Sequence, residues 1–167
     1  MSVLTYNNKR SGCYLGESAP LNIINEEVIV ASGSGKLDPG TVLGRISLGG
    51  ASSSAKSGGN TGNGTLTLDP TTPVLAGAKD GVYTVRLIEA DTDAGVFRVE
   101  DPEGNVIGDV AVGGTFADDI KFTTADGATD FAVGDGFDIT VAKGSKKFVP
   151  HDPDATDGSQ FVKGILF

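Results

Sequence analysis

The feature that most constrains the fold is a series of short apolar runs in residues 60–142, separated from one another by turn-forming residues. In one of these runs Tyr83, Val85 and Leu87 alternate with polar side chains, which is the pattern of a strand with one buried face. Similar short apolar runs occupy residues 65–69, 96–100, 106–112, 120–124 and 137–141. No 3.6-residue period interrupts the series, so we expect an all-β module of six to eight strands, an antiparallel β-sandwich or small barrel.

Two turns indicate how successive strands in this module pair. The loop at residues 90–95 (ADTDAG) separates two alternating runs, which we expect to form a hairpin. Residues 101–105 (DPEGN) have Pro at the second position of a turn and Gly near its end. This composition should reverse the chain into the following strand.

A Gly- and Ser-rich stretch marks the start of the module. Residues 49–64 (GGASSSAKSGGNTGNG) have no hydrophobic period, so we expect a linker or a long mobile loop there. The simplest organisation is an insertion: linker plus acidic module at residues 57–142, within a discontinuous β-domain formed by residues 21–56 and 143–167. Residues 1–20 have neither a period nor a dense apolar set, and we expect an extended N-terminal arm.

The flanking sequence also favours β-structure. Residues 26–33 (EEVIVASG) read as a strand that ends in a Gly/Ser turn. Asp38, Pro39 and Gly40 predict a second turn, with another strand after it.

The net charge of −9 comes from the module. Residues 60–142 carry four basic and fifteen acidic side chains, whereas residues 1–59 carry five and four, and residues 143–167 carry four and three. An acidic surface repels phosphate backbones. We therefore expect no direct binding of nucleic acid.

The chain has one Cys and one His, too few for an intramolecular disulfide or a four-ligand Cys/His zinc site. No apolar run is long enough to cross a membrane, and the N-terminal residues lack the apolar core of a signal peptide. We expect a protein made in the cytoplasm, with no cofactor and no membrane partner.

The strongest metal candidate is the short pattern formed by Asp91, Asp93 and Gly95, which is similar to the start of a calcium loop. The remaining ligands of that loop are missing. Asp and Gly also stabilise tight turns on their own. The turn is the favoured interpretation, and we predict no metal site.

Candidate catalytic groups are equally sparse. His151 lies in a Pro- and Asp-rich loop, and the chain has no G-x-S-x-G elbow to present a nucleophilic serine. Residues 33–36 (GSGK) lack the spacing of a phosphate-binding loop. We therefore expect a protein that is not an enzyme.

The sequences before and after the module, taken together, point to one protein family. The G-T-V-L-G segment at residues 40–44, followed much later by D-G-S at 157–159 and G-I-L at 164–166, resembles the lambda-type head decoration proteins of tailed bacteriophages. The central run is similar to β-rich modules inserted in several phage structural proteins. The residues that carry the resemblance are Gly40, Thr41, Val42, Leu43, Gly44, Asp157, Gly158, Ser159, Gly164, Ile165 and Leu166.

This resemblance implies a structural protein of the virion that binds the outer surface of the expanded capsid as a homotrimer and stabilises the shell. It also implies an arm that becomes ordered against the major capsid protein, by adding a strand to an exposed sheet edge. The candidate capsid contacts in the arm are its apolar residues Leu4, Tyr6, Tyr14 and Leu15.

The alternative is a surface-displayed module that recognises a glycan or a host-cell surface. Glycan sites usually rely on exposed aromatic side chains that stack on sugar rings. The module has no Trp, and Tyr83 is its one tyrosine. The residues therefore favour the structural role.

Overall fold

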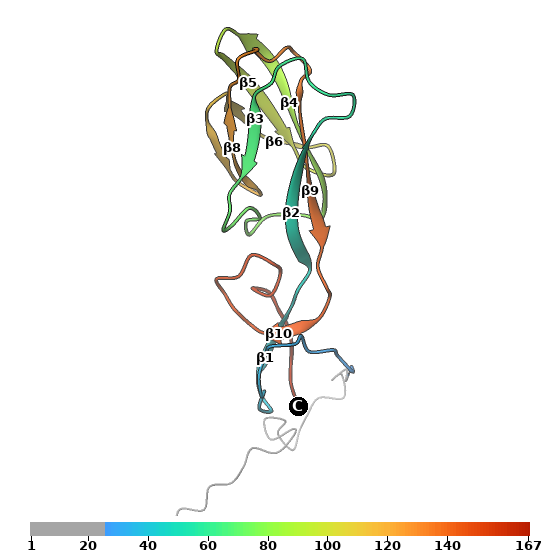
Figure 1. Cartoon of the computed structure of the whole chain (residues 1–167). Coiled ribbons are helices and arrows are strands. Elements are labelled where there is room, and N and C mark those ends of the chain that lie inside the picture. The colour runs from blue at the N-terminus through green and yellow to red at the C-terminus, as the bar shows by residue number, and fades with distance from the viewer. Residues whose placement is uncertain (1–25) are drawn as a thin grey trace, which may run out of the picture. The chain divides into compact units, whose positions relative to one another are not determined.

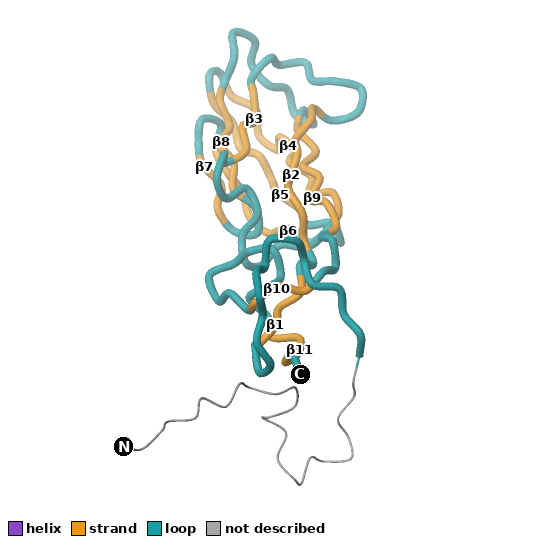
Figure 2. The backbone as a smooth tube through the Cα atoms, turned by 60° about the horizontal axis from the view of Figure 1, so that its bottom comes forward, coloured by secondary structure: helices purple, strands orange, loops and turns teal. Residues whose placement is uncertain are grey.

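The computed structural model describes residues 26–167, and strands and loops make up this part of the chain (Figure 2). Between residues 26 and 167 no helix is long and apolar enough to cross a membrane. The predicted all-β class is confirmed. The strands are β1 (Val42–Arg45), β2 (Leu48–Ala55), β3 (Thr65–Leu68), β4 (Gly81–Asp91), β5 (Ala94–Glu100), β6 (Val106–Ala111), β7 (Thr115–Ala117), β8 (Lys121–Ala125), β9 (Gly136–Lys143), β10 (Phe148–Pro150) and β11 (Val162–Ile165).

The chain divides into two compact units. Unit 1 combines Met1–Ile46 with Lys146–Phe167, and unit 2 is Ser47–Ser145. Unit 2 contains β2 to β9, while β1, β10 and β11 belong to unit 1.

Unit 2 is a two-layer antiparallel sandwich (Figure 1). One sheet has the order β2-β9-β4-β5-β6 and the other the order β3-β8-β7. The predicted hairpin is present, because β4 pairs with β5 from Thr84 opposite Glu100 to Asp91 opposite Ala94. The predicted turn at residues 101–105 is also present, and it leads into β6 paired with β5.

The core of unit 2 lies between its two sheets. Tyr83, Val85 and Leu87 of β4 are all buried, as their alternation predicts. Phe97 of β5 meets Phe131 edge-on, with ring centroids 5.1 Å apart. The facing sheet contributes Leu66, Phe116 and Phe122 to the same cluster, and Ile120, just before β8, joins them. Each fully buried side chain of this size contributes about 1.5–3 kcal/mol.

The prediction of a linker or loop at residues 49–64 is wrong for residues 49–55. Residues 49–55 belong to β2, which pairs with β9 from Leu48 opposite Lys143 to Ala55 opposite Phe137. Ladder hydrogen bonds use backbone groups, which every non-proline residue supplies. A segment of Gly, Ala and Ser residues can therefore form an edge strand when its backbone pairs with an apolar neighbouring strand.

The second half of that stretch, residues 56–64, is a loop held by a buried carboxylate. Asp135 is 3% exposed, and its side chain accepts hydrogen bonds from the backbone N–H groups of Thr61 and Gly62, each at 2.9 Å. Burial alone raises the pKa of Asp135, but the donated N–H bonds outweigh it and lower this pKa overall.

In its described residues unit 1 has one small antiparallel sheet, of order β10-β1-β11. The turn expected at residues 38–40 is present, with Gly40 at φ +91°, and it precedes β1. The strand expected at residues 26–33 is wrong. Among the described residues only Val30 pairs there, in an isolated parallel bridge to Phe148.

Candidate functional site

Two of the three sequence segments that carry the resemblance pair with each other in unit 1. In the pairing of β1 with β11, Val42 lies opposite Ile165 and Leu43 lies opposite Gly164. The pairing continues to Thr41, whose carbonyl oxygen accepts a 2.9 Å hydrogen bond from the N–H of Leu166. Residues more than 115 positions apart in the chain thus form one structural element.

The third segment packs against the same strand. Ser159 is buried, and a Cβ atom placed on Gly44 would collide with the Ser159 backbone. Only glycine allows this close approach of β1 to the 157–159 turn. This contact explains why the motif has a glycine at position 44.

The 157–159 turn is held by its own side chains. Asp157 accepts hydrogen bonds from the N–H of Ser159 at 2.9 Å and from its hydroxyl at 2.5 Å. Gly158 has φ +100°, a conformation that favours glycine. The imidazole Nε2 of His151 lies 3.0 Å from the carbonyl oxygen of Gln160. The backbone N–H of His151 donates to the Val42 carbonyl at 2.9 Å. These contacts give His151 a structural place between β1 and the turn.

Unit 1 exposes an unusual share of its large apolar side chains. In the described residues of the much larger unit 2 only Val82, Val106 and Val133 are strongly exposed. The exposed apolar residues of unit 1 are Ile29, Val42, Phe161, Val162, Ile165 and Phe167. Large exposed apolar surfaces mark sites where another molecule binds.

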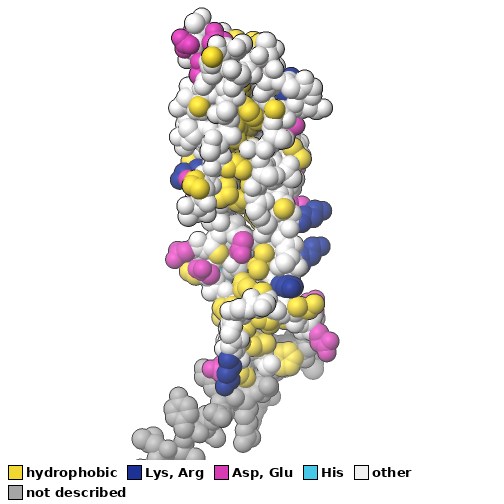
Figure 3. All heavy atoms as spheres, viewed as in Figure 1, with side chains coloured by type: hydrophobic (Ala, Val, Ile, Leu, Met, Phe, Trp, Pro, Cys, Tyr) yellow, Lys and Arg dark blue, Asp and Glu magenta, His cyan; other side chains and the backbone are white. Residues whose placement is uncertain are grey.

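Part of this set forms a continuous surface. Val42 and Ile165 are direct cross-strand neighbours, so their side chains share one face of the sheet. Figure 3 shows apolar side chains gathered on the visible face of unit 1. Across the described chain β11 pairs with β1 alone, and its other edge offers unpaired backbone groups.

The sequence motifs pointed to β1 and β11 but not to Ile29, Phe161, Val162 or Phe167. For Phe161, Val162 and Phe167 the signal in the sequence is the apolar density of the last seven residues, FVKGILF, in a unit with few places to bury them. The predicted arm contacts Leu4, Tyr6, Tyr14 and Leu15 lie outside the described residues.

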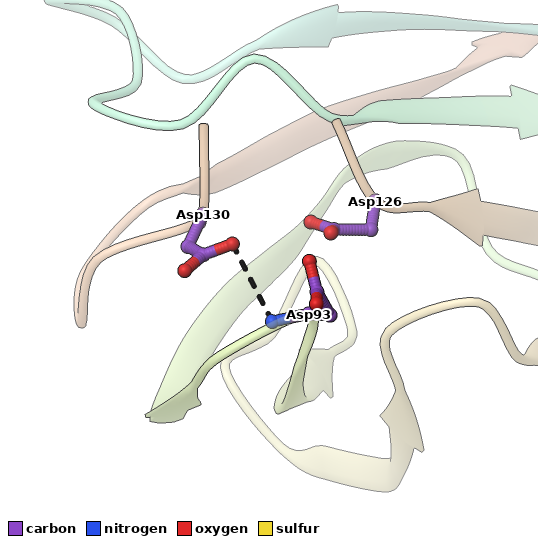
Figure 4. Close-up of side chains that lie close together, drawn as sticks. All are labelled: Asp93, Asp126 and Asp130. Atoms are coloured by element: carbon purple, nitrogen blue, oxygen red, sulfur yellow. Dashed lines mark hydrogen bonds between the residues drawn. The ribbon is translucent and has the colours of Figure 1, made fainter. Parts of the chain in front are cut away.

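Unit 2 contains three carboxylates that lie close together. Asp93, from the β4–β5 turn, and Asp126 and Asp130, from the loop after β8, have oxygen atoms within 4.8 Å of one another (Figure 4). The N–H of Asp93 donates to Asp130 at 3.4 Å. Asp91, the other acid of the calcium-like pattern, instead accepts a hydrogen bond from the N–H of Thr92. The side chains of Asp93 and Asp130 are exposed, and we assign no metal to the group.

An ion-pair cluster in unit 2 joins two turns of the sandwich. The Lys79 ammonium lies 2.8 Å from Asp101 and 2.7 Å from Glu103, which ties the loop before β4 to the β5–β6 turn. Hydrogen bonding to Lys79 and then to Asn105 holds the pKa of Asp101 well below its usual range. The Tyr83 hydroxyl accepts the N–H of Lys79, and burial raises the pKa of Tyr83 to about 12.

Comparisons with solved structures give two weak likenesses, both to FlgL of Xanthomonas campestris. These crystal structures are 21% and 20% identical to the chain, with a TM-score of 0.40 in each case. The likeness covers 65% and 62% of this chain, which spans a third of the length of the FlgL chains. At this level of similarity it supports no inference about function.

The comparison with curated proteins finds no match. A family model, in contrast, matches residues 4–167, a range that includes all three motif segments of unit 1. The chain therefore belongs to the bacteriophage lambda head decoration protein D family, a family of structural proteins of the phage capsid.

Proposed function

We propose that the protein binds the outer surface of the expanded capsid as a homotrimer and stabilises the shell. Unit 1 makes the contacts with the major capsid protein and with the other two copies, and unit 2 is displayed outward. The observation that supports this assignment best is the concentration of exposed apolar side chains in unit 1, next to the family motifs.

The distribution of charge supports the same division. The described part of unit 1 carries six acidic and five basic side chains, whereas unit 2 carries fifteen acidic and six basic. Three copies of unit 1 can approach one another with little repulsion, while copies of unit 2 repel one another. Attachment through unit 1 therefore keeps the acidic units at the periphery.

The arm adds a second attachment. We propose that residues 1–20 pair with a sheet edge of the major capsid protein, with Leu4, Tyr6, Tyr14 and Leu15 as the side chains that fix the register. Hydrogen exchange should show rapid exchange of the amides of residues 3–15 in the free protein and protection on the capsid. Strong protection in the free protein would contradict this mechanism.

Two valines of equal chemistry test the role of unit 1. Val162 of β11 is 58% exposed and Val106 of β6 is 55% exposed. Binding to purified expanded capsids that lack decoration should weaken about tenfold or more for Val162→Ser, because the variant loses apolar burial at the contact. Val106→Ser should bind like the parent.

Titration of these capsids with the parent protein also gives the number of copies bound at each three-fold position. Saturation at three copies for each three-fold position supports the trimer. Equal binding by both valine variants and the parent would contradict a capsid contact through unit 1. Saturation at one copy for each position would contradict the trimer.

A further inference from the structure

The two units differ sharply in how much core they contain. The connected cluster of buried apolar residues lies wholly in unit 2. In the described part of unit 1 the one buried large apolar side chain is Leu43, at 2% exposure. Since burial of apolar surface is the main favourable contribution to folding, the described residues of unit 1 have little with which to offset their conformational entropy.

The two ends of unit 2 lie side by side. Ser47 and Gly144 are joined by a hydrogen bond from the Gly144 N–H to the Ser47 carbonyl at 2.9 Å. Within unit 1 the next residues outward are also paired, because the Lys146 N–H donates to the Ile46 carbonyl at 2.9 Å. Both crossings of the chain between the units thus occur where the two chain segments, just outside the strands, are hydrogen-bonded to each other.

We infer that folded unit 2 acts as an internal clamp on which the folding of unit 1 depends. While unit 2 is folded, it delivers Ile46 and Lys146 as neighbours, ready for β1 to pair with β10. When unit 2 is unfolded, the same two residues are joined by about 100 flexible residues. Closing a loop of that length lowers the folding equilibrium constant of unit 1 by about 1,000-fold, and one buried leucine does not restore it.

The biological consequence rests on the proposed function. If unit 1 binds the capsid, then the inserted unit is more than a displayed appendage, because it shapes the binding unit before contact with the shell. The dependence runs in one direction. Unit 2 has its own core and does not need unit 1.

A pair of substitutions on one strand tests the clamp in the full chain. Val85 is fully buried in β4, and Val85→Asp places a charge in the core, which should unfold unit 2. Val82, on the same strand, is 45% exposed, so Val82→Asp introduces the same charge at the surface and should leave unit 2 folded. Neither variant alters a residue of unit 1.

Hydrogen exchange in the free protein is the readout. The amides of Gly40, Ile46, His151 and Leu166 are hydrogen-bonded within unit 1. In Val85→Asp they should exchange at the rate of an unstructured chain, and in Val82→Asp at the parental rate. Protection of these amides in Val85→Asp, when unit 2 has lost its own protection, would overturn the inference. It would show that unit 1 folds alone or is completed by residues 1–25.

The reverse perturbation tests the direction. Leu43→Ala should remove protection from unit 1, while Leu87, Val112 and Thr124, whose amides are bonded within unit 2, keep theirs. Loss of protection in both units would contradict a one-way dependence. If Val85→Asp aggregates, exchange of the parent in increasing urea gives the same answer, because no urea concentration should leave unit 1 protected after unit 2 has opened. None of these measurements uses capsids, so their failure is separate from failure of the proposed function.

Discussion

Gly44 shows how a single residue can fix the geometry of unit 1. Its Cα approaches the Ser159 backbone so closely that no side chain fits, whereas a Cβ on Gly164, on the paired strand, would meet open space. We predict that Gly44→Ala destabilises unit 1 and weakens capsid binding, because the 157–159 turn must move away from β1. Gly164→Ala should have little effect on either. Exchange of the His151 amide, which is bonded to β1, measures the difference; equal exchange in the two variants would contradict the prediction.

Asp135 is a buried carboxylate whose ionisation contributes to the stability of unit 2. Its pKa is lowered by the N–H groups it accepts, so its contribution to stability is fully present above the ordinary Asp value of about 3.9 and is lost as pH falls through the lower, folded value. Asp135→Asn should cost about 1–3 kcal/mol at neutral pH, because backbone N–H groups lose an acceptor. Urea denaturation at pH 7 and pH 3 should show that the variant has lost part of the parental acid sensitivity.

The matched control is Asp130→Asn, in the same loop but exposed. It should leave the free energy of unfolding near the parental value at neutral pH. A loss equal to that of Asp135→Asn would mean that net charge, and not the buried carboxylate, stabilises this loop.

At the level of elements, alternation of apolar and polar side chains predicted the β4–β5 hairpin correctly. The Gly- and Ser-rich composition of residues 49–55 did not predict their structure. The β4–β5 hairpin could be predicted because Tyr83, Val85 and Leu87 leave one face of a strand apolar. β2 could not, because its Gly, Ala and Ser residues have no hydrophobic period and gain their structure from pairing with β9. Tertiary pairing thus overrode a local preference for flexibility.

Loops also contribute to the core, which no strand pattern reveals. Phe131 lies between β8 and β9, is 3% exposed and packs edge-on against Phe97. Phe131→Ala should lower the free energy of unfolding of unit 2 by about 3–5 kcal/mol, measured by urea denaturation. Phe161→Ala, at an exposed position of unit 1, should leave that free energy unchanged and weaken capsid binding instead. A small effect of Phe131→Ala would mean that the loop relaxes into the cavity.

The candidate site likewise contains residues that the sequence revealed and residues that it did not. Its motif segments were visible in the sequence because their residues have local roles: Gly44 passes close to the Ser159 backbone, and the Ser159 hydroxyl bonds to Asp157. The exposed apolar residues Phe161 and Val162 were not, because exposure depends on how little of unit 1 is available to cover them. A sequence pattern alone would place apolar residues in a core.

For the whole molecule, the separation of charge predicts how attachment responds to salt. Unit 1 is nearly neutral in its described residues, so capsid binding should depend on apolar burial and strand pairing, which salt does not screen. Decorated shells should keep their added resistance to heat at roughly half-molar salt, where the Debye length is only a few ångströms. Release of the protein between low salt and that concentration would show that charge pairs are the main attachment.

The Lys and Arg side chains of unit 2 are already engaged. Five of the six form ion pairs with carboxylates, and Lys56 donates to the Gly59 carbonyl. In the proposed arrangement the outermost layer of a decorated particle carries uncompensated carboxylates, and particles should disperse because these layers repel one another. Near the isoelectric pH of the chain, about 4.4, that repulsion vanishes. Decorated particles should lose their electrophoretic mobility and flocculate there, at a pH set by the coat and not by the shell beneath it.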